Sequence, residues 1–293
     1  MRDDAPSRTA AWVAAGRQLG MLLPDNVRLV EDHYGAAFSS PALASLIERQ
    51  GLRAAANVPG IRSWILYMQV RTRVIDDALR AFVAGGGRQL VLLGAGYDCR
   101  PLRIPELAET SVFEVDHPAT QGHKRSVLGT LGALSPSHYV TWDFEARPME
   151  DLPEALEQAG LDATAPTFTI WEGVTMYLSE PAIDASLRAI RTWSAAGSRL
   201  AMTYFAKSRI VKPSLMTRAI KAVVAQIGEP WRFGWTPEEL PAYLGERGFS
   251  LVSDLALADA ARELLPRELA VHVGHPDRRF ALSAAAESIA VAR

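Results

Sequence analysis

The chain has 293 residues, 48% hydrophobic and 22% charged, with 21 Gly and 18 Pro, a composition that excludes collagen-like, disordered and coiled-coil proteins. The 31 Lys and Arg residues against 33 Asp and Glu residues give a net charge of −2, so we expect no nucleic-acid and no membrane partner. A single cysteine, Cys99, and the lack of a signal-peptide pattern or a long apolar run predict a cytoplasmic protein without a metal site.

The first 84 residues have the pattern of a helical cap. Apolar residues at helical spacing, with charged residues between them, predict an amphipathic helix over residues 62–83. Shorter helical patterns cover 10–23 and 41–50. The composition changes at the three glycines 85–87. We therefore expect two parts, an N-terminal helical cap over 1–84 and an α/β domain over 85–293.

The second part alternates apolar, strand-like runs with helical patterns such as 118–131 and 181–195. Such alternation predicts a mostly parallel sheet with helices on both faces. A helical insertion over about 207–228 follows the fifth run. The last two runs can instead close the sheet with an antiparallel strand. The seven expected strands are 89–93, 111–115, 139–142, 167–171, 199–204, 250–255 and 289–292.

A glycine turn, Gly94-Ala95-Gly96, directly follows the first strand. Ligands of open α/β sheets bind beyond the carboxyl ends of strands, and glycine lets the backbone approach a ligand closely. The third glycine of the dinucleotide fingerprint is missing, because Cys99 stands at that position. The turn therefore favours a cofactor without a pyrophosphate, although a turn that serves only tight packing stays an alternative.

Acidic residues follow the next strands. Asp116 lies twenty residues after Gly96, the distance at which a carboxylate can accept both ribose hydroxyls, and its alternative role is to cap the helix that begins at Pro118. Glu114, within the same strand, is expected to pair with a nearby arginine.

The third and fourth strands each end beside a carboxylate. Asp143 and Phe144 follow the third strand and could contact an adenine, although a loop cap is the commoner role of such an aspartate. Glu172 ends the fourth strand at the centre of the sheet. A carboxylate there is costly unless it meets a cation or hydrogen-bond donors, which an ammonium or sulfonium ligand would supply.

Three stretches in this order and spacing resemble the leucine carboxyl methyltransferase family, class I S-adenosylmethionine-dependent O-methyltransferases that include bacterial polyketide carboxyl methyltransferases. They are Val-Leu-Leu-Gly-Ala-Gly-Tyr-Asp-Cys-Arg at 91–100, Val-Phe-Glu-Val-Asp-His-Pro at 112–118 and Trp-Glu-Gly-Val-Thr-Met-Tyr-Leu at 171–178. The upstream helix with Arg71 and the turn at 230–235 also resemble the family. The resemblance implies a Rossmann-like, seven-stranded fold, S-adenosylmethionine as cofactor and S-adenosylhomocysteine as product.

The resemblance also implies roles for individual residues. It places the methionine part of the cofactor at Gly94, Ala95 and Gly96, and the ribose at Asp116. It places the adenine at Asp143 and Phe144, the amino group near Glu172 and the carboxylate on Arg71. Tyr177 matches a family tyrosine near the transferred methyl group, and is the candidate catalytic residue. Arg17 is a further candidate for the carboxylate, although its spacing differs from that of the family.

The acceptor is the open question. No histidine stands in a catalytic motif, and all six are expected to be structural or exposed. Without a placed base, a small polyketide-like or aromatic carboxylate is favoured over a phenol or other hydroxyl, which would need one. Eight aromatic residues can line the acceptor pocket, with at least half expected in the core instead: Trp12, Trp64, Tyr67, Tyr204, Phe205, Trp231, Phe233 and Trp235. A nicotinamide oxidoreductase and a non-catalytic binding scaffold are remoter alternatives, and the oligomeric state is not predicted.

Overall fold

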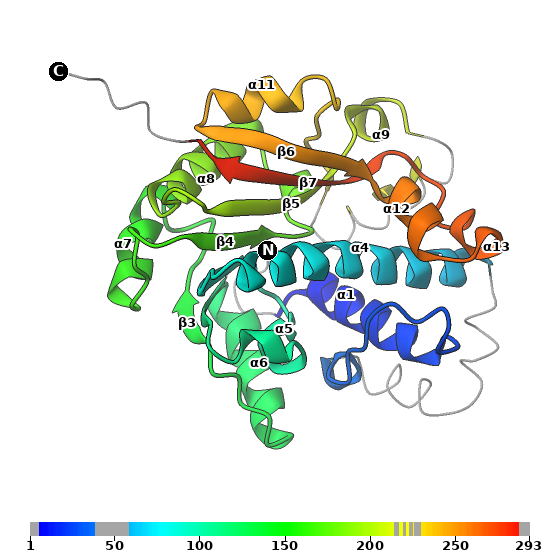
Figure 1. Cartoon of the computed structure of the whole chain (residues 1–293), viewed down its shortest axis with the longest axis horizontal. Helices are drawn as coiled ribbons and strands as arrows, with labels where there is room; N and C mark the ends of the chain where they lie inside the picture. The colour runs from blue at the N-terminus through cyan, green and yellow to red at the C-terminus, as the bar shows by residue number, and fades with distance from the viewer. Residues whose placement is uncertain are drawn as a thin grey trace.

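A seven-stranded mixed sheet organises the protein, whose structure is a computed structural model (Figure 1). The structure describes residues 6–38, 59–213, 217–218, 221–222, 225 and 230–286. The strand order is β3-β2-β1-β4-β5-β7-β6. The strands are β1 Gln89–Leu93, β2 Ser111–Asp116, β3 His138–Thr141, β4 Thr167–Trp171, β5 Arg199–Phe205, β6 Phe249–Ala256 and β7 Arg278–Ala285.

The first five strands pair in parallel with one another, whereas β7 runs antiparallel to both β5 and β6. Every residue of β1 and β4 is buried, as expected for central strands covered on both faces. The prediction of a mostly parallel sheet of seven strands is confirmed. The strand predicted over 289–292 lies outside the described residues, and the antiparallel strand of the sheet is β7, which was not predicted from the sequence.

Two hydrophobic clusters flank the sheet. On one face, the long helix α4 Pro59–Ala84 packs with α12 Leu257–Leu264 and α13 Arg267–Ala270. On the other, α7 Leu152–Gln158, α8 Glu180–Thr192 and α11 Leu240–Gly245 cover the strands. The first cluster joins residues of the predicted cap to residues of the sheet, and the domain boundary at residue 84 stays a prediction.

Helix starts follow local sequence signals. Ser7 caps α1 Arg8–Leu19 and Ser179 caps α8, each accepting from a backbone N–H three residues later. Pro118 opens α6 Pro118–Thr130, where its missing N–H costs nothing. Figure 1 shows α1 lying beside α4, with α6 at the edge of the sheet that ends in β3.

The remaining elements are short. They comprise η1 Gly20–Leu22, η2 Gly35–Phe38, α5 Arg100–Arg103, η3 Pro105–Leu107, η4 Met149–Asp151, η5 Thr175–Tyr177 and α9 Lys207–Val211. The helix predicted over 41–50 lies outside the described residues, and so does much of the insertion after α9. Within the described part of the chain, no helix is both long and apolar enough to cross a bilayer.

Candidate active site

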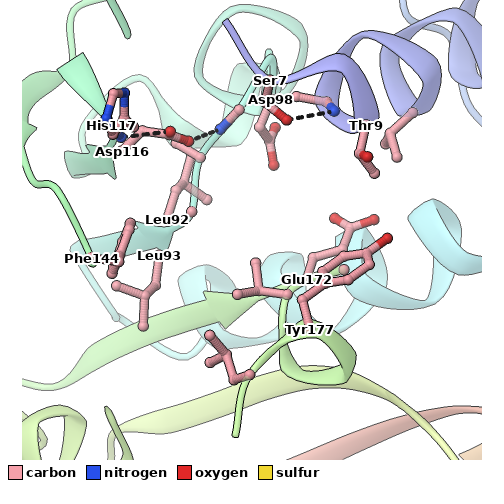
Figure 2. A pocket seen from close by; sticks show the side chains of 18 of the residues that line it. Ser7, Thr9, Leu92, Leu93, Asp98, Asp116, His117, Phe144, Glu172 and Tyr177 are labelled. Atoms are coloured by element: carbon pink, nitrogen blue, oxygen red, sulfur yellow. Dashed lines mark hydrogen bonds between the residues drawn. The ribbon is translucent and has the colours of Figure 1, made fainter. Parts of the chain in front are cut away.

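One pocket of about 420 Å³ lies beyond the carboxyl ends of β1, β2 and β4. All nine residues predicted for the site line it, and so does Arg17. Figure 2 shows Asp116, His117 and Phe144 on one side of the pocket and Glu172 and Tyr177 on the other. The structure thus brings the predicted residues together, while the role of each stays a prediction.

The glycine turn after β1 has the geometry that only glycine adopts readily. Gly94 has φ +72° and Gly96 φ +50°. A Cβ on Gly94 would lie 2.8 Å from Val174 Cγ2, and one on Gly96 would lie 3.0 Å from the Cβ of Ala10 in α1. The turn therefore needs glycine both for its backbone conformation and for the close approach of its neighbours.

Asp116, at the end of β2, is bound to this turn. Its carboxylate accepts a hydrogen bond from the backbone N–H of Gly96 and one of 2.6 Å from that of His117. Burial raises its pKa to about 6, although the two N–H donors act in the opposite direction. The helix cap proposed as its alternative role is supplied by His117, whose Nδ1 accepts from Ala119 N at 3.2 Å.

Glu114, two residues before Asp116 in β2, forms a buried ion pair instead. Its carboxylate pairs with Lys124 at 2.5 Å, and both side chains are fully buried. The expectation of an arginine partner was wrong. Lys124 belongs to α6, and its long side chain reaches Glu114 in β2. The same ammonium group also donates to Asp98 O in the turn after β1.

Asp143 and Phe144 follow β3 and line the pocket. Asp143 accepts from the backbone N–H groups of Glu145 and Ala146, which lower its pKa, so it has the loop-capping role left open from the sequence. It also lines the pocket, 3.7 Å from His117 Nε2. Phe144 is 38% exposed, so its ring is available to a planar ligand.

Glu172 finds its cations within the chain. Arg100 Nη1 lies 2.9 Å from Glu172 Oε2, and Arg71 Nε lies 2.7 Å from Glu172 Oε1. The carboxylate is buried, but these two arginines overcome the effect of burial and lower its pKa to about 2. The sequence predicts that this carboxylate meets a cation or donors, with an ammonium or sulfonium ligand as the candidate, and in the structure two arginines of the chain already meet that need.

Arg100 is the site residue that the sequence did not single out. It stands at the end of the first matching stretch, yet its guanidinium also pairs with Asp76 of α4 at 2.7 Å and with Asp98. An arginine two residues after an aspartate in a ligand-binding turn was the available signal. Arg17, from α1, is likewise bound within the chain, to Asp32 Oδ2 at 2.8 Å and Tyr97 O at 2.6 Å.

The eight aromatic residues considered for the acceptor do not appear among the described residues that line the pocket. Most belong to the core, as the alternative expected, and Trp12 is 64% exposed. The pocket is instead covered by the start of α1, through Ser7, Thr9 and Ala10, as Figure 2 shows in part.

The residues present fit the methionine end of S-adenosylmethionine. Arg71 Nε and Glu172 Oε1 form an ion pair with each other at 2.7 Å, but neither buried atom makes a hydrogen bond of good geometry. A zwitterionic amino acid has a carboxylate for the first and an ammonium group for the second. Among the described residues, no group of three or more His, Cys, Asp or Glu side chains is arranged to hold a metal ion, and catalysis without metal stays a prediction.

The sheet order and the pocket at its ligand-binding edge define a class I S-adenosylmethionine-dependent methyltransferase. The sequence profile of leucine carboxyl methyltransferase matches residues 10–191, and the chain belongs to this family.

Relatives in actinobacteria agree with this assignment. The chain is 34% identical over 265 residues to a protein of Mycobacteroides abscessus that is provisionally named an S-adenosyl-L-methionine-dependent methyltransferase, covering 86% of this chain and 84% of that one. A Parafrankia protein with the same provisional name is 32% identical over 268 residues, covering 89% and 82%.

Solved structures share the fold. A crystal structure of a DUF574 family protein from Streptomyces avermitilis superposes with a TM-score of 0.60 at 17% identity, covering 92% of this chain and 96% of that one. One from Thermobifida fusca gives 0.59 at 19% identity, covering 97% and 96%.

Proposed function

We propose that this methyltransferase esterifies the carboxylate of a small-molecule acid, polyketide-like or aromatic, in the cytoplasm, as part of secondary metabolism. In S-adenosylmethionine a sulfonium makes the methyl carbon electrophilic, so that an acceptor oxygen in line with the carbon–sulfur bond can displace the thioether. The protein's task is then to hold the two reactants in line about 3–3.5 Å apart and to exclude water.

The observation that carries this proposal is the state of Glu172, the carboxylate on the same side of the pocket as Tyr177. Its two arginine partners lower its pKa to about 2, which makes it a poor proton acceptor near neutral pH. His117 lies at the other side and uses Nδ1 as a helix cap. An acceptor that is already ionised needs no base, and a carboxylate meets that condition whereas a phenol does not.

The proposed roles in cofactor binding follow the geometry of the pocket. The turn formed by Gly94, Ala95 and Gly96 would hold the methionine part, with Arg71 at its carboxylate and Glu172 at its amino group. Asp116 would accept the ribose hydroxyls. At the far side, Asp143 and Phe144 would contact the adenine.

The chemical nature of the product tests the proposal. Purified enzyme is incubated with labelled S-adenosylmethionine and matched aromatic acids and phenols, and each labelled product is treated with mild alkali. A methyl ester is cleaved and releases labelled methanol, as we expect. A labelled product that resists alkali is an ether, and would establish phenol methylation instead.

A further inference from the structure

A cluster of hydrogen-bond donors with few acceptors lies next to the pocket, where the last residue of β5 pairs with the first residue of β7. Phe205 ends β5 and pairs in register with Arg278, the first residue of β7. Arg209, from α9, packs its guanidinium 4.9 Å from the Phe205 ring and 5.2 Å from the Trp231 ring. These four residues are called the β5–β7 cluster below.

The cluster adjoins the proposed catalytic centre. Phe205 and Trp231 pack with Met176, and Tyr177 packs against the same group. The turn that carries Trp231 is fixed to the turn that carries Tyr177, because Arg232 N donates to Met176 O at 2.7 Å. Pro230 and Arg232, on either side of Trp231, both line the pocket.

Positive charge in this cluster is not balanced by the described residues. Arg209 is 3% exposed, and its one carboxylate partner, Asp277, lies at the long distance of 3.4 Å. Arg278 has no carboxylate within ion-pair distance among the described residues, and its guanidinium lies 4.1 Å from the Tyr67 ring. The guanidinium of Arg71 also lies near the Tyr67 ring, at 5.5 Å, but its charge is already paired with Glu172.

Unused donors are buried in the same place. Arg209 Nε and Trp231 Nε1 are buried and have no hydrogen-bond partner. Burial lowers the pKa of Arg278; Arg209 and Arg71 act in the same direction, whereas Tyr67 and Asp277 oppose them. Leaving such groups buried and unpaired is costly, and a bound anion would remove the cost. Arg278 and Asp277 are partly exposed, so an anion can reach the cluster.

We propose that the β5–β7 cluster binds a carboxylate of the methyl acceptor other than the oxygen that is methylated. The rings of Phe205 and Trp231 contact Arg209 and belong to the apolar group against which Tyr177 packs, so we expect an apolar segment between the two carboxylates of the acceptor. Resting on the proposed function, this inference makes the acceptor a dicarboxylic acid that leaves the enzyme as its monomethyl ester.

Binding to the enzyme saturated with S-adenosylhomocysteine tests the inference. The probes are the linear dicarboxylates from succinate to sebacate, each compared with the monocarboxylate of equal chain length by calorimetry. We expect at least one dicarboxylate to bind about tenfold tighter or more than its monocarboxylate, the usual effect of one charge-assisted hydrogen-bond set. If no dicarboxylate is preferred, the inference is wrong.

Variants assign the preference to the cluster. Arg278→Gln is expected to abolish it and Arg278→Lys, which keeps the charge without the planar fork, to retain part of it. Arg262→Gln, which removes an exposed arginine of α12, is the matched control and should leave it unchanged. Affinity for S-adenosylhomocysteine, measured on each variant, confirms that the protein is folded.

The result separates the two proposals. A preference that Arg278→Gln abolishes, together with an alkali-resistant product and no ester in the product test, would keep the subsite and overturn carboxyl methylation. Ester formation with a preference that survives Arg278→Gln would overturn the subsite and keep carboxyl methylation.

Discussion

Arg100 and Glu172 are joined across the centre of the sheet, with Nη1 of one 2.9 Å from Oε2 of the other. Arg100 begins α5 just after the glycine turn of β1, whereas Glu172 follows β4. The same guanidinium reaches Asp76 in α4. One buried side chain therefore fixes the glycine turn, the end of β4 and the helix that carries Arg71 relative to one another.

Removing Arg100 should destabilise the whole fold. In Arg100→Gln, three carboxylates lose their shared cation in a buried site, which typically costs about 3–5 kcal/mol. Arg73→Gln is a suitable control, because Arg73 and its partner Asp77 are both exposed on α4 and such pairs contribute at most about 0.5 kcal/mol. The free energy of unfolding from urea titration measures both. Equal losses would show that the buried network adds no stability.

Asp116→Ala should weaken binding of S-adenosylhomocysteine by about 1.5–3 kcal/mol if the carboxylate accepts ribose hydroxyls. Calorimetry on the folded variant measures this. An unchanged affinity would leave Asp116 with only its present role, which is to accept from the backbone of Gly96 and His117.

The pH dependence provides a second measurement on the same residue. The pKa of Asp116 is about 6 in the folded chain against an ordinary value of 3.8. Between pH 3.8 and about 6 the carboxyl is therefore protonated in the folded state and ionised in the unfolded state. Its contribution to the free energy of unfolding therefore falls by roughly 2–3 kcal/mol as pH rises from about 4 to 6, and stays constant above. Asp116→Asn should lack this fall, and a wild type and variant with parallel stability profiles would contradict it.

The site residues that the sequence predicted best are glycines and carboxylates at the carboxyl ends of predicted strands, where α/β proteins bind ligands. Gly94 and Glu172 each follow a buried parallel strand and Asp116 ends one, and parallel topology alone brings such positions to one edge. The partners of Glu172 could not be predicted in this way. Arg71 and Arg100 are distant in sequence, and only the packing of α4 against the sheet brings them to the same carboxylate.

Strand β7 is an element that the apolar pattern of the sequence did not predict. Residues 278–285 contain four alanines or serines and two arginines, a composition with low strand preference. They form a strand because they pair with β5 on one side and β6 on the other. Tertiary pairing therefore overrides local preference there, whereas the more apolar residues 289–292 attracted the prediction.

Arg71→Lys should weaken binding of S-adenosylhomocysteine by about tenfold, because lysine keeps the charge but loses the planar fork that grips a carboxylate. The effect on Glu172 should be small, since Arg100 remains. Calorimetry compares wild type and variant, with Arg73→Lys on the same helix as the control. If Arg71→Lys binds as tightly as wild type, Arg71 serves to neutralise Glu172 and not to hold the ligand.

Tyr177→Phe should lower kcat while leaving the affinity for S-adenosylhomocysteine nearly unchanged. Tyr177 lines the pocket on the same side as Glu172, from where its hydroxyl can orient an acceptor oxygen along the methyl–sulfur axis. Loss of one orienting hydrogen bond typically costs about 0.5–1.5 kcal/mol, which is roughly a two- to tenfold fall in kcat. A fall in cofactor affinity of the same size would assign the hydroxyl to cofactor binding instead.

The pH profile of this reaction decides what the tyrosine orients. A carboxylate acceptor is ionised throughout the range from about pH 6 to 9, and Glu172, with a pKa of about 2, is ionised there too, so the wild-type kcat should be flat. Tyr177→Phe should lower this flat profile without changing its shape, because an orienting group exchanges no proton. A wild-type rate that rises about tenfold per pH unit over this range would instead show that the acceptor must lose a proton, as a phenol does. In that case the first candidates for the base would be Asp116, His117 and Tyr177, three of the titratable side chains that line the pocket.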